Sequence, residues 1–294
     1  MTETDSASAW TQVTLVLVTY NSALVIDDCL SSLSAAPNII VVDNASTDNT
    51  CKIITNRFPQ VNLVRNSVNK GFGAGVNQGM AKVKTTFAFY FSPDAILMDN
   101  AMEILVNTAL ENPKAALIGP LMQRPNGEIE LYVMGPSESR HSPISRLPDG
   151  PFCTWFIMGG FFLTPISIWR EIGGFDERIF LYSEDMDLSL RMTKQGYGML
   201  IDPAARVVHA GGQSSRMTWS VRWRKDWHQT WSRLYVAAKH GLSDRVRCEA
   251  RDIVQKHFFR ALLYLFLLRP DRVRGNLAKA CGALAFLAGR KGSK

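Results

Sequence analysis

Short apolar runs that end in polar residues recur along the first part of the chain. The first runs from Val13 to Tyr20 and closes on Asn21, and the second runs from Ile39 to Val42 and closes on Asp43. Continuous β-branched runs of this length are typical of parallel strands covered by helices on both faces. Ligands of open α/β sheets bind beyond the carboxyl ends of such strands. The pattern therefore predicts one ligand site built from two neighbouring strand ends.

Strand and helix patterns alternate over the same region. We expect strands at 13–19, 39–43, 61–65, 87–91 and 115–119, and helices at 24–35, 48–58, 73–83 and 100–111. Strands that alternate with helices form βαβ units, so the prediction is an α/β fold with a mainly parallel, Rossmann-like sheet flanked by helices.

The remaining chain is less regular. Residues 123–150 are rich in Pro, Gly, Ser and Arg, which predicts a hairpin near 128–133 and a long loop over 135–151. Further strands are expected at 161–164, 199–201 and 206–209, with helices at 166–172 and 185–195. Beyond Gly212 the pattern is helical. The expected organisation is a flexible N-terminus over 1–11, an α/β domain over 12–218 and a helical region over 219–294.

Charge and cysteine content narrow the class of protein. The net charge is +7, and most of the excess lies after Arg216. A basic, aromatic-rich end suits anionic lipid or nucleic acid better than a small neutral ligand. The five cysteines lack CxxC spacing, so neither a zinc site nor a disulfide framework is predicted, and a reducing cytosolic location is the simplest interpretation. The polar N-terminus is not a secretory signal, and no apolar run reaches the ~20 residues that span a bilayer.

Two segments after the early strands carry candidate ligand groups. Asp43 and Asn44 can bind a base or a sugar hydroxyl, although Asp43 can equally cap the following helix. The glycine-rich segment 66–79 follows the third strand and opens a helix. Glycines permit close backbone approach and helix N-termini attract phosphate, although a tight turn is the alternative.

Ser92-Pro93-Asp94 follows the strand at 87–91. A carboxylate there suits a divalent cation that bridges two phosphates, whereas the alternative is a type I turn. His209 ends another apolar strand. A histidine in this position is usually structural, but together with Asp94 it can complete a metal site.

Glu184, Asp185 and Asp187 stand at the start of a predicted helix. Capping and the helix dipole explain part of this pattern, and the dipole should lower the pKa of a carboxyl placed there. We expect Tyr182, Met186 and Leu190 to share one buried helical face, which leaves Glu184 and Asp185 at the mouth of the fold. A carboxylate in that position can take a proton from an attacking hydroxyl.

Taken together, these segments resemble the family 2 glycosyltransferases of the GT-A fold, especially the bacterial rhamnosyltransferase-like branch. The matching pieces occur in the family's order over about residues 12–240. They are VTYN at 18–21, VVDNASTDNT at 41–50, NKGFGAGVNQG at 69–79, SPDA at 92–95, GGFDERIFLYSEDMDLSLR at 173–191 and VVHAGGQSS at 207–215.

The resemblance implies a GT-A catalytic domain, a nucleotide-diphosphate sugar as donor, and inversion at the anomeric carbon. It implies that Asp185 is the general base and that Glu184 orients the acceptor or the sugar. It implies Mg²⁺ or Mn²⁺ as cofactor, bound by Asp94 with His209 as a second ligand. The donor would contact Thr19, Asn21, Asp43, Asn44, Asn69, Gly71, Asn77, Ser92 and Asp94.

Two positions depart from the family pattern. Ser92 stands where the first acid of the metal-binding motif is expected, and Ala210 replaces a frequent second histidine. Since a serine hydroxyl binds a metal or a ribose only weakly, the strictness of metal dependence stays open.

The C-terminal region carries two apolar features. Trp219, Trp223, Trp227 and Trp231 recur every four residues, so they form a helical stripe that packs on the catalytic domain or lies in a membrane interface. Residues 258–268 and 277–287 are apolar stretches followed by basic residues. We expect these helices to dock on the cytoplasmic face of the cell membrane, which makes the protein peripheral, or to pair in a homodimer.

The branch resemblance favours dTDP-rhamnose as donor and a polyprenyl-linked or cell-surface glycan as acceptor, with no nucleic acid partner. UDP-galactose, UDP-galactofuranose and UDP-GlcNAc stay open as donors. A nucleotidyltransferase would need a glycine-rich loop with a basic residue near 18–22, which the sequence lacks. A nucleic-acid-binding protein would explain the basic end of the chain but not the acids at the strand ends.

Overall fold

The computed structural model describes residues 9–131, 147–158, 160–209 and 218–292. Internal contacts divide the chain into two units. The α/β unit comprises residues 1–70, 74–175 and 188–216, and the helical unit comprises 71–73, 176–187 and 217–294. The sequence-based boundary at 218/219 left 71–73 and 176–187 in the catalytic domain, and that division stays a prediction.

The N-terminal segment is only partly covered. Most of the expected flexible N-terminus, residues 1–8, lies outside the described residues, whereas residues 9–11 form a helical turn. Ala9 in that turn is buried in the main core, so the ordered chain begins before residue 12.

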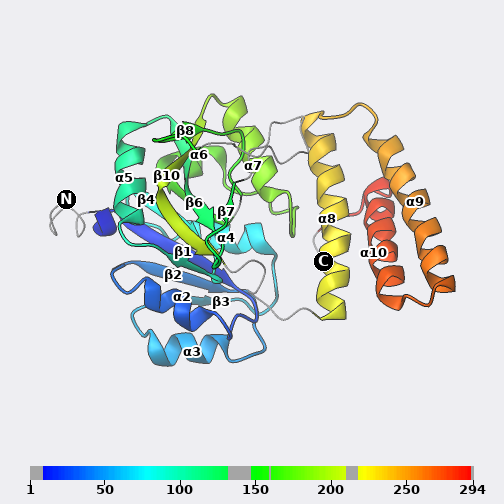
Figure 1. The fold of residues 1–294 in the computed structure, drawn as a ribbon, viewed down its shortest axis with the longest axis horizontal. Coiled ribbons are helices and arrows are strands. Elements are labelled where there is room, and N and C mark those ends of the chain that lie inside the picture. Colours follow the sequence, from blue (N-terminus) through cyan, green and yellow to red (C-terminus); the bar gives the residue numbers. More distant parts are fainter. Residues whose placement is uncertain (1–8, 132–146, 159, 210–217, 293–294) are drawn as a thin grey trace. The chain divides into compact units, whose positions relative to one another are not determined.

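The described part of the α/β unit contains one ten-stranded sheet (Figure 1). Four neighbouring strands run parallel: β3 (Asn62–Arg65), β2 (Ile39–Asp43), β1 (Val13–Thr19) and β4 (Phe87–Phe91). The order then continues through β9 (Phe161–Pro165), β6 (Ala115–Gln123), β10 (Gly198–His209) and β5 (Ala95–Leu97), of which β9 and β5 are antiparallel to their neighbours. The predicted α/β class with a mainly parallel sheet is confirmed.

Helices cover both faces of this sheet. Alternate residues of β1, such as Leu15 and Leu17, share a core with α2 (Ile26–Ser32), α3 (Thr50–Arg57) and α5 (Ala101–Glu111). The opposite face of β1 carries Val16 and Val18. A Cβ on Gly79 or Gly75 of α4 (Phe72–Met80) would stand 2.5 Å from Val16 or 2.9 Å from Val18, so these glycines let α4 pack closely on the sheet.

The observed elements correct several sequence-based boundaries. The two short strands expected at 199–201 and 206–209 are one strand, β10, with an irregularity between Asp202 and Arg206. β5 and β8 (Phe152–Cys153) were not predicted, because runs this short carry no periodic signal. β7 (Ile129–Glu130) pairs with β6 and confirms the start of the hairpin, while most of the expected long loop, 132–146, lies outside the described residues.

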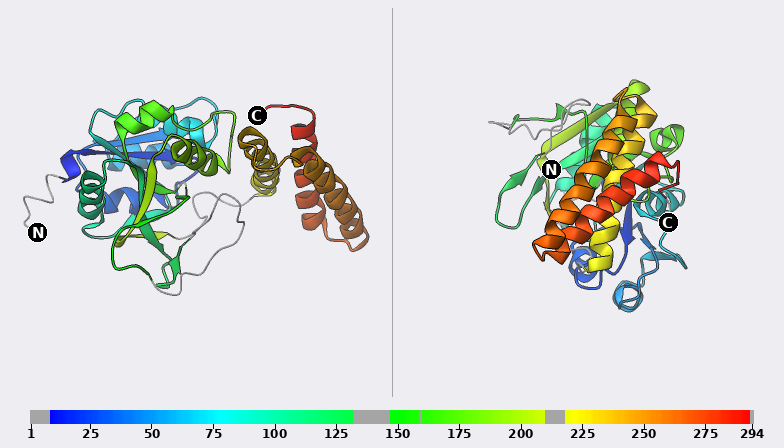
Figure 2. Two further views of the ribbon diagram at one scale, coloured as in Figure 1. Left: turned by 90° about the horizontal axis from the view of Figure 1, so that it is seen from above. Right: turned by 90° about the vertical axis from the view of Figure 1, so that its right-hand side faces the viewer.

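The C-terminal part of the helical unit contains α8 (Trp219–His240), α9 (Val246–Phe266) and α10 (Pro270–Leu287) (Figure 2). α10 packs against both α8 and α9. Leu234, Val246, Ala250 and Ala283 form a small core there. None of the helices in the described ranges combines the length and the hydropathy that crossing a membrane requires.

The tryptophan stripe of α8 divides along its length. Trp231 is buried, stacks on Trp227 and Tyr235, and donates from Nε1 to the carbonyl of Arg290 at 3.0 Å. Trp219, the first residue of α8, and Trp223, about one turn later, are 53% and 38% exposed. The C-terminal half of the stripe therefore packs within the helical unit, whereas the two tryptophans of the N-terminal half are exposed to solvent.

Candidate active site

The ends of β1 and β2 form a closed network of hydrogen bonds. The parallel register pairs Thr19 with Asp43, so both strands end at the same level, as predicted. Thr19 Oγ1 donates to Asp43 Oδ1 at 3.0 Å, and Ser46 donates to the same carboxylate from Oγ at 2.5 Å and from its backbone N–H at 2.9 Å. Asp43 is almost completely buried, so its carboxylate first fixes the loop at 44–47.

The two asparagines beside Asp43 also serve this loop. Asn21 adopts a left-handed backbone conformation, and its Oδ1 accepts from the backbone N–H of Thr47 at 2.8 Å. Asn44 Oδ1 accepts from Asn66 Nδ2 at 2.9 Å, which ties the β2 loop to the residue after β3. The N-terminus of α3 is served by Asp48, whose Oδ1 accepts from the backbone N–H of Thr50 at 3.0 Å. Asp43 therefore caps its own loop rather than the following helix.

Asp94 and His209 meet because two distant strands pair. β5 begins directly after Asp94, and its first residue, Ala95, is the register partner of His209 at the end of β10. His209 Nε2 lies 3.4 Å from Asp94 Oδ1, and Ser92 Oγ donates to the same oxygen at 2.5 Å. Burial by itself would raise the pKa of Asp94. The hydrogen bonds from His209 and Ser92 outweigh burial and lower this pKa to about 2. Asp94 is therefore a carboxylate at neutral pH.

This pair fits part of a divalent metal site. Carboxylate oxygen and imidazole nitrogen are suitable ligands for Mn²⁺, and Mg²⁺ accepts the carboxylate. The other ring nitrogen of His209, Nδ1, is buried and lacks a hydrogen-bond partner within the described residues. No cluster of three or more His, Cys, Asp or Glu suited to a metal occurs there either, so water or a bound diphosphate would have to complete the coordination.

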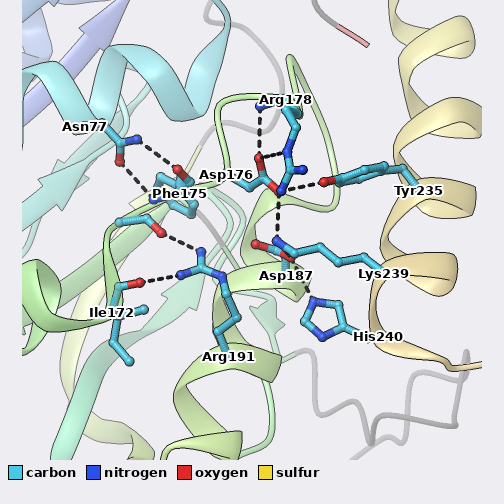
Figure 3. Close-up of polar contacts among 11 residues, drawn as sticks. Asn77, Ile172, Phe175, Asp176, Arg178, Asp187, Arg191, Tyr235, Lys239 and His240 are labelled. Atoms are coloured by element: carbon cyan, nitrogen blue, oxygen red, sulfur yellow. Dashed lines mark hydrogen bonds and ion pairs between the residues drawn. The ribbon is translucent and has the colours of Figure 1, made fainter. Parts of the chain in front are cut away.

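The glycine-rich segment at 66–79 makes close contacts with other parts of the protein. Gly71 has φ +93°, and a Cβ there would stand 2.6 Å from the carbonyl oxygen of Phe180. Asn77 uses both ends of its amide on the backbone of Phe175, with Nδ2 donating to the carbonyl and Oδ1 accepting from the N–H, each at 2.9 Å (Figure 3). Asn69 is half-buried in the loop between β3 and α4. Donor contacts by these three residues stay predictions.

A left-handed stretch precedes the acidic helix. Tyr182 and Ser183 have φ of 67° and 64°, so α7 (Glu184–Lys194) begins at Glu184 and the helix expected at 185–195 is confirmed. The expectation that Tyr182 shares a buried helical face with Met186 and Leu190 is wrong, because Tyr182 is not helical and all three side chains are only half-buried. The buried face of α7 carries Asp187, Leu188 and Met192 instead.

Glu184 and Asp185 are neighbouring carboxyls in different environments. Glu184 is buried, and its Oε2 lacks a hydrogen-bond partner within the described residues. Burial and the charge of Asp185 raise the pKa of Glu184 well above its usual value. Asp185 is half-buried, and its Oδ1 accepts from the backbone N–H of Met186 at 2.8 Å. Glu184 thus keeps its proton to a higher pH than an exposed glutamate does, as expected when two interacting carboxyls differ in burial.

Two further acids, Asp176 and Asp187, connect residues 176–187 to α8, which the sequence did not indicate. Asp187 is fully buried, and its Oδ1 lies 2.5 Å from Lys239 Nζ and 2.8 Å from His240 Nε2 (Figure 3). Asp176 accepts from Tyr235 OH and Lys239 Nζ, each at 2.8 Å, and pairs with Arg178. Burial by itself would raise the pKa of Asp176. The hydrogen bonds from Arg178, Lys239 and Tyr235 outweigh burial and lower this pKa below its usual range.

The segment between these acids also contacts α8. The ring of Phe180 stacks on His228 with centroids 4.7 Å apart, and Ser232 Oγ donates to the carbonyl of Leu181 at 2.9 Å. Burial is the main cause that lowers the pKa of His228 to about 4, so this imidazole is neutral at physiological pH. We call residues 176–187 the acid segment. Its contacts with α8 span three turns of that helix, from His228 to His240.

A separate contact fixes the turn before the acid segment. Within the α/β unit, the guanidinium of Arg191 donates from Nη1 to the carbonyl of Ile172 at 2.9 Å and from Nη2 to that of Gly174 at 2.5 Å (Figure 3). Gly174 has φ +67° and lies against the amide of Asn77. The sequence signal for this turn was the pair Gly173-Gly174, but the sequence could not indicate which side chains hold it.

Curated relatives of this chain are glycosyltransferases by name. N-acetylglucosaminyl-diphospho-decaprenol L-rhamnosyltransferase of Mycobacterium tuberculosis (strain CDC 1551 / Oshkosh) is 28% identical over 235 residues, which cover 68% of this chain and 76% of the relative. Rhamnosyltransferase WbbL of Escherichia coli (strain K12) is 34% identical over 87 residues, which cover 30% of this chain and 32% of the relative.

Solved structures share the fold at low sequence identity. The mannosyltransferase PcManGT from Pyrobaculum calidifontis, solved with GDP-Man and Mn²⁺, has a TM-score of 0.59 at 16% identity, covering 97% of this chain and 94% of that one. GalNAc-T7, solved with UDP, GalNAc and Mn²⁺, has a TM-score of 0.56 at 17% identity; the match covers 67% of this chain and 43% of that chain. The expected GT-A fold is confirmed.

Family models match most of the described chain. The model named glycosyl transferase family 2 matches residues 14–175, and the model named glycosyl transferase family group 2 matches residues 129–270. The first match covers the strand ends with Asp43 and Asp94, and the second covers the acid segment and α8. The predicted enzyme class is confirmed: this chain belongs to glycosyl transferase family 2.

Proposed function

We propose that the protein is an inverting rhamnosyltransferase, which moves rhamnose from dTDP-rhamnose to a hydroxyl of a lipid-linked or cell-surface glycan. The relative from M. tuberculosis, whose printed name includes a diphospho-decaprenol acceptor, supports this sugar and this acceptor class. The name of WbbL supports the sugar. The observation in this molecule that carries the proposal is the Glu184–Asp185 pair, because an inverting transfer needs one ionised carboxylate beside the acceptor.

Asp185 is the general base in this proposal. It takes the proton of the acceptor hydroxyl as that oxygen attacks the anomeric carbon and the nucleoside diphosphate leaves. Burial raises the pKa of Glu184, which opposes a second negative charge next to the base. Its unpartnered Oε2 can hydrogen-bond to the acceptor or to the sugar and fix its orientation. A retaining reaction through an enzyme nucleophile would need another positioned carboxylate, and we assign none.

The strand ends bind the donor in this proposal. Thr19, Asn21, Asp43 and Asn44 surround the nucleoside, with Asp43 facing the base, and Asn69, Gly71 and Asn77 border the ribose and diphosphate. The carboxylate of Asp43 already accepts from Thr19 and Ser46, so the loop is ordered before the donor arrives. Preordering of this kind lowers the entropic cost of binding.

Asp94 and His209 would hold Mg²⁺ or Mn²⁺, with Ser92 as a weak auxiliary donor. When bound, the cation would offset the negative charge that develops on the leaving diphosphate. The low pKa of Asp94 keeps the ligand ionised, and Ser92 orients its carboxylate through the 2.5 Å hydrogen bond. Position 92 carries an acid in the family pattern. Here Ser92 instead donates a hydrogen bond to the carboxylate of Asp94.

The acceptor class suggests where the protein works. A polyprenyl-linked acceptor lies in a bilayer, so we propose a cytoplasmic protein that binds peripherally to the inner face of the cell membrane. A homodimer through the C-terminal helices is the competing arrangement. The exposed aromatic and aliphatic side chains of α9 support a surface contact of one of these two kinds.

A thermal-shift screen of nucleotide sugars, each with and without Mn²⁺, tests the donor assignment. We expect dTDP-rhamnose to raise the melting temperature most, and Mn²⁺ to increase that shift, because a ligand that binds only the native state stabilises it. A larger shift with UDP-galactose, UDP-galactofuranose or UDP-GlcNAc would change the sugar but keep the reaction. The whole transferase proposal fails if no nucleotide sugar stabilises the protein.

A further inference from the structure

Side chains of the three C-terminal helices line an open polar pocket that the proposed reaction does not use. Its volume is about 220 Å³, several times the ~30 Å³ that one water occupies in the liquid. Four basic side chains line it and two acids accompany them; these are Arg222, Arg260, Arg272 and Lys279 with Asp226 and Asp271. All of them lie on α8, α9 and α10, so the pocket lies entirely within the helical unit.

The charges of this pocket are only partly balanced. Lys279 Nζ lies 3.6 Å from Asp226, and Arg272 donates to Tyr264 OH at 3.1 Å while its guanidinium stands over the tyrosine ring. Arg222 and Arg260 have no carboxylate within ion-pair distance among the described residues. Two arginines that converge on one polar cavity suit an anion with several acceptor oxygens, such as a phosphate ester.

The histidine of the pocket does not add to its positive charge. His257 Nδ1 and Asn276 Oδ1 are 2.7 Å apart, and burial is the main cause that lowers the pKa of His257, with Lys279, Arg260 and Lys256 adding to it. The imidazole therefore contributes no positive charge of its own at neutral pH. The electrostatic attraction rests on the basic side chains of the three arginines and Lys279.

The exposed side chains of α9 change in character half way along the helix. In the N-terminal half they are polar apart from Cys248, and they include Arg251, Asp252, Gln255 and Lys256. In the C-terminal half and the following turn, all exposed side chains except that of Arg260 are aromatic or aliphatic, namely Phe258, Phe259, Leu262, Leu263, Leu265, Phe266, Leu267 and Leu268. Phe266 and Leu268 are 84% and 86% exposed. We call this second set the apolar tip.

The apolar tip and the pocket belong to one stretch of helix. Residues 257, 260 and 264 recur at intervals of three and four and line the pocket, whereas Phe259, Leu262 and Phe266 recur at the same interval on the other side of α9. Arg269, Arg272 and Arg274 follow directly and are exposed. An exposed apolar surface beside a basic one is typical of helices that lie in the headgroup zone of anionic membranes.

We propose that the apolar tip inserts into the interface of an anionic bilayer and that the pocket around Arg260 and Arg272 binds the phosphate of a lipid headgroup. The proposal deepens the proposed function, since it gives an enzyme with a lipid-linked acceptor a defined membrane contact. Charge complementarity selects the bilayer over a second copy of this chain. Two-fold pairing of the tips would bring two strongly basic surfaces together, whereas an anionic membrane neutralises them.

Vesicle co-sedimentation of the full chain, without donor or acceptor, tests this surface. One set of vesicles contains phosphatidylcholine alone and the other adds one third phosphatidylglycerol. We expect clear binding to the anionic vesicles, weaker binding to the neutral ones, and a loss of the difference in high salt. Because no sugar is present, the result is independent of the transferase reaction, which a soluble short-chain acceptor can test separately.

Two matched pairs of variants separate the pocket from the tip. Arg260→Gln should reduce binding to anionic vesicles about fivefold, whereas Arg251→Gln on the same helix, outside the pocket, should reduce it less. Phe259→Ser combined with Phe266→Ser should reduce binding to both vesicle types by about tenfold or more, since each exposed ring loses its burial in lipid. The control for the tip is Leu110→Ser, an exposed leucine on α5, which should leave binding unchanged.

Several outcomes would overturn the proposal. Absence of vesicle binding by the parent chain refutes it outright. Equal losses in Arg260→Gln and Arg251→Gln would reduce the pocket to general surface charge, and stabilisation by inorganic phosphate without vesicle binding would make it a soluble-anion site. If the chain is a dimer by light scattering and Phe259→Ser with Phe266→Ser makes it monomeric, the tip is a subunit interface instead.

Discussion

The strand-end site and the acid segment are built by different means. At the strand ends, Thr19, Asp43, Asp94 and His209 are brought together by backbone pairing, since register fixes Thr19 opposite Asp43 and Ala95 opposite His209. The acid segment runs from a glycine turn into the first turn of α7 and is held by side chains of α8. Sheet register involves many hydrogen bonds and tolerates single changes, whereas the acid segment depends on a few buried polar contacts.

This difference separates the two halves of the proposed reaction. The residues assigned to donor binding belong to the α/β unit, apart from Gly71, and those assigned to proton transfer belong to the helical unit. Substitutions in α8 should therefore change turnover more than nucleotide binding. Substitutions at the strand ends should do the reverse.

The largest expected effect is on turnover at the proposed base. Asp185→Asn removes the proton acceptor and should lower kcat by about 10²–10⁴-fold while nucleotide binding changes little. Steady-state kinetics and nucleotide titration measure the two quantities. Asp28→Asn, an exposed acid of α2, is the control. Retained turnover in Asp185→Asn would remove this residue from the mechanism.

Next in size is the buried attachment of the acid segment to α8. Asp187→Asn leaves His240 and one side of Lys239 without a charged partner and should lower the free energy of unfolding by about 3–5 kcal/mol. Arg57→Gln breaks the exposed pair with Asp27 and should cost about 1 kcal/mol or less. Denaturant titration compares them. Similar losses would mean that the buried contacts do not dominate the stability of the acid segment.

A smaller effect is expected at the strand-end metal pair. Ser92→Ala deletes the hydroxyl that donates to Asp94 and should weaken Mn²⁺ binding about 10–100-fold, as loss of a group that orients a ligand generally does. The measurement is the Mn²⁺ dependence of nucleotide-induced thermal stabilisation. Thr85→Ala, which removes a hydroxyl from the bend before β4, is the control. Equal Mn²⁺ dependence in the parent and Ser92→Ala would argue that Ser92 does not support the ligand.

The smallest expected effect concerns pH and the buried acid beside the base. The raised pKa of Glu184 means that the native state keeps a proton that the unfolded chain loses above about pH 4.5. This group therefore costs stability as pH rises from 4.5 toward its raised native value. Glu184→Gln removes that cost. The melting temperature of the variant minus that of the parent should therefore increase from pH 4.5 to pH 8. A constant difference across this range would contradict the assignment of a protonated Glu184.

Much of the sheet could be predicted from the sequence, because its strands are continuous apolar runs. The bounds predicted for the strands at 13–19, 39–43 and 87–91 agree with β1, β2 and β4. β5 escaped prediction because three residues carry no periodic pattern, although its pairing with β10 is what brings Asp94 to His209. Local pattern therefore identified both residues, and a non-local strand pair joined them.

The acid segment shows where local rules fail. The sequence predicted a continuous helical face from Tyr182, whereas two left-handed residues, Tyr182 and Ser183, precede the helix. The acid at 187 was interpreted through the helix dipole, yet it is fully buried against Lys239 and His240, more than fifty residues away in the chain. Asn77 was expected near the ribose, but both ends of its side-chain amide form hydrogen bonds with the backbone of Phe175.

The sequence by itself determined the α/β class, the strand ends that carry Asp43 and Asp94, and the acidic start of α7, because β-branched runs and helix starts are local signals. Only the tertiary structure decided which side chains these groups meet. It joined Asp94 to His209, raised the pKa of Glu184 by burying it, attached Asp176 and Asp187 to α8, and left the end of α9 exposed beside a basic pocket. The physical reason is that burial and partner choice are set by contacts between residues far apart in the chain.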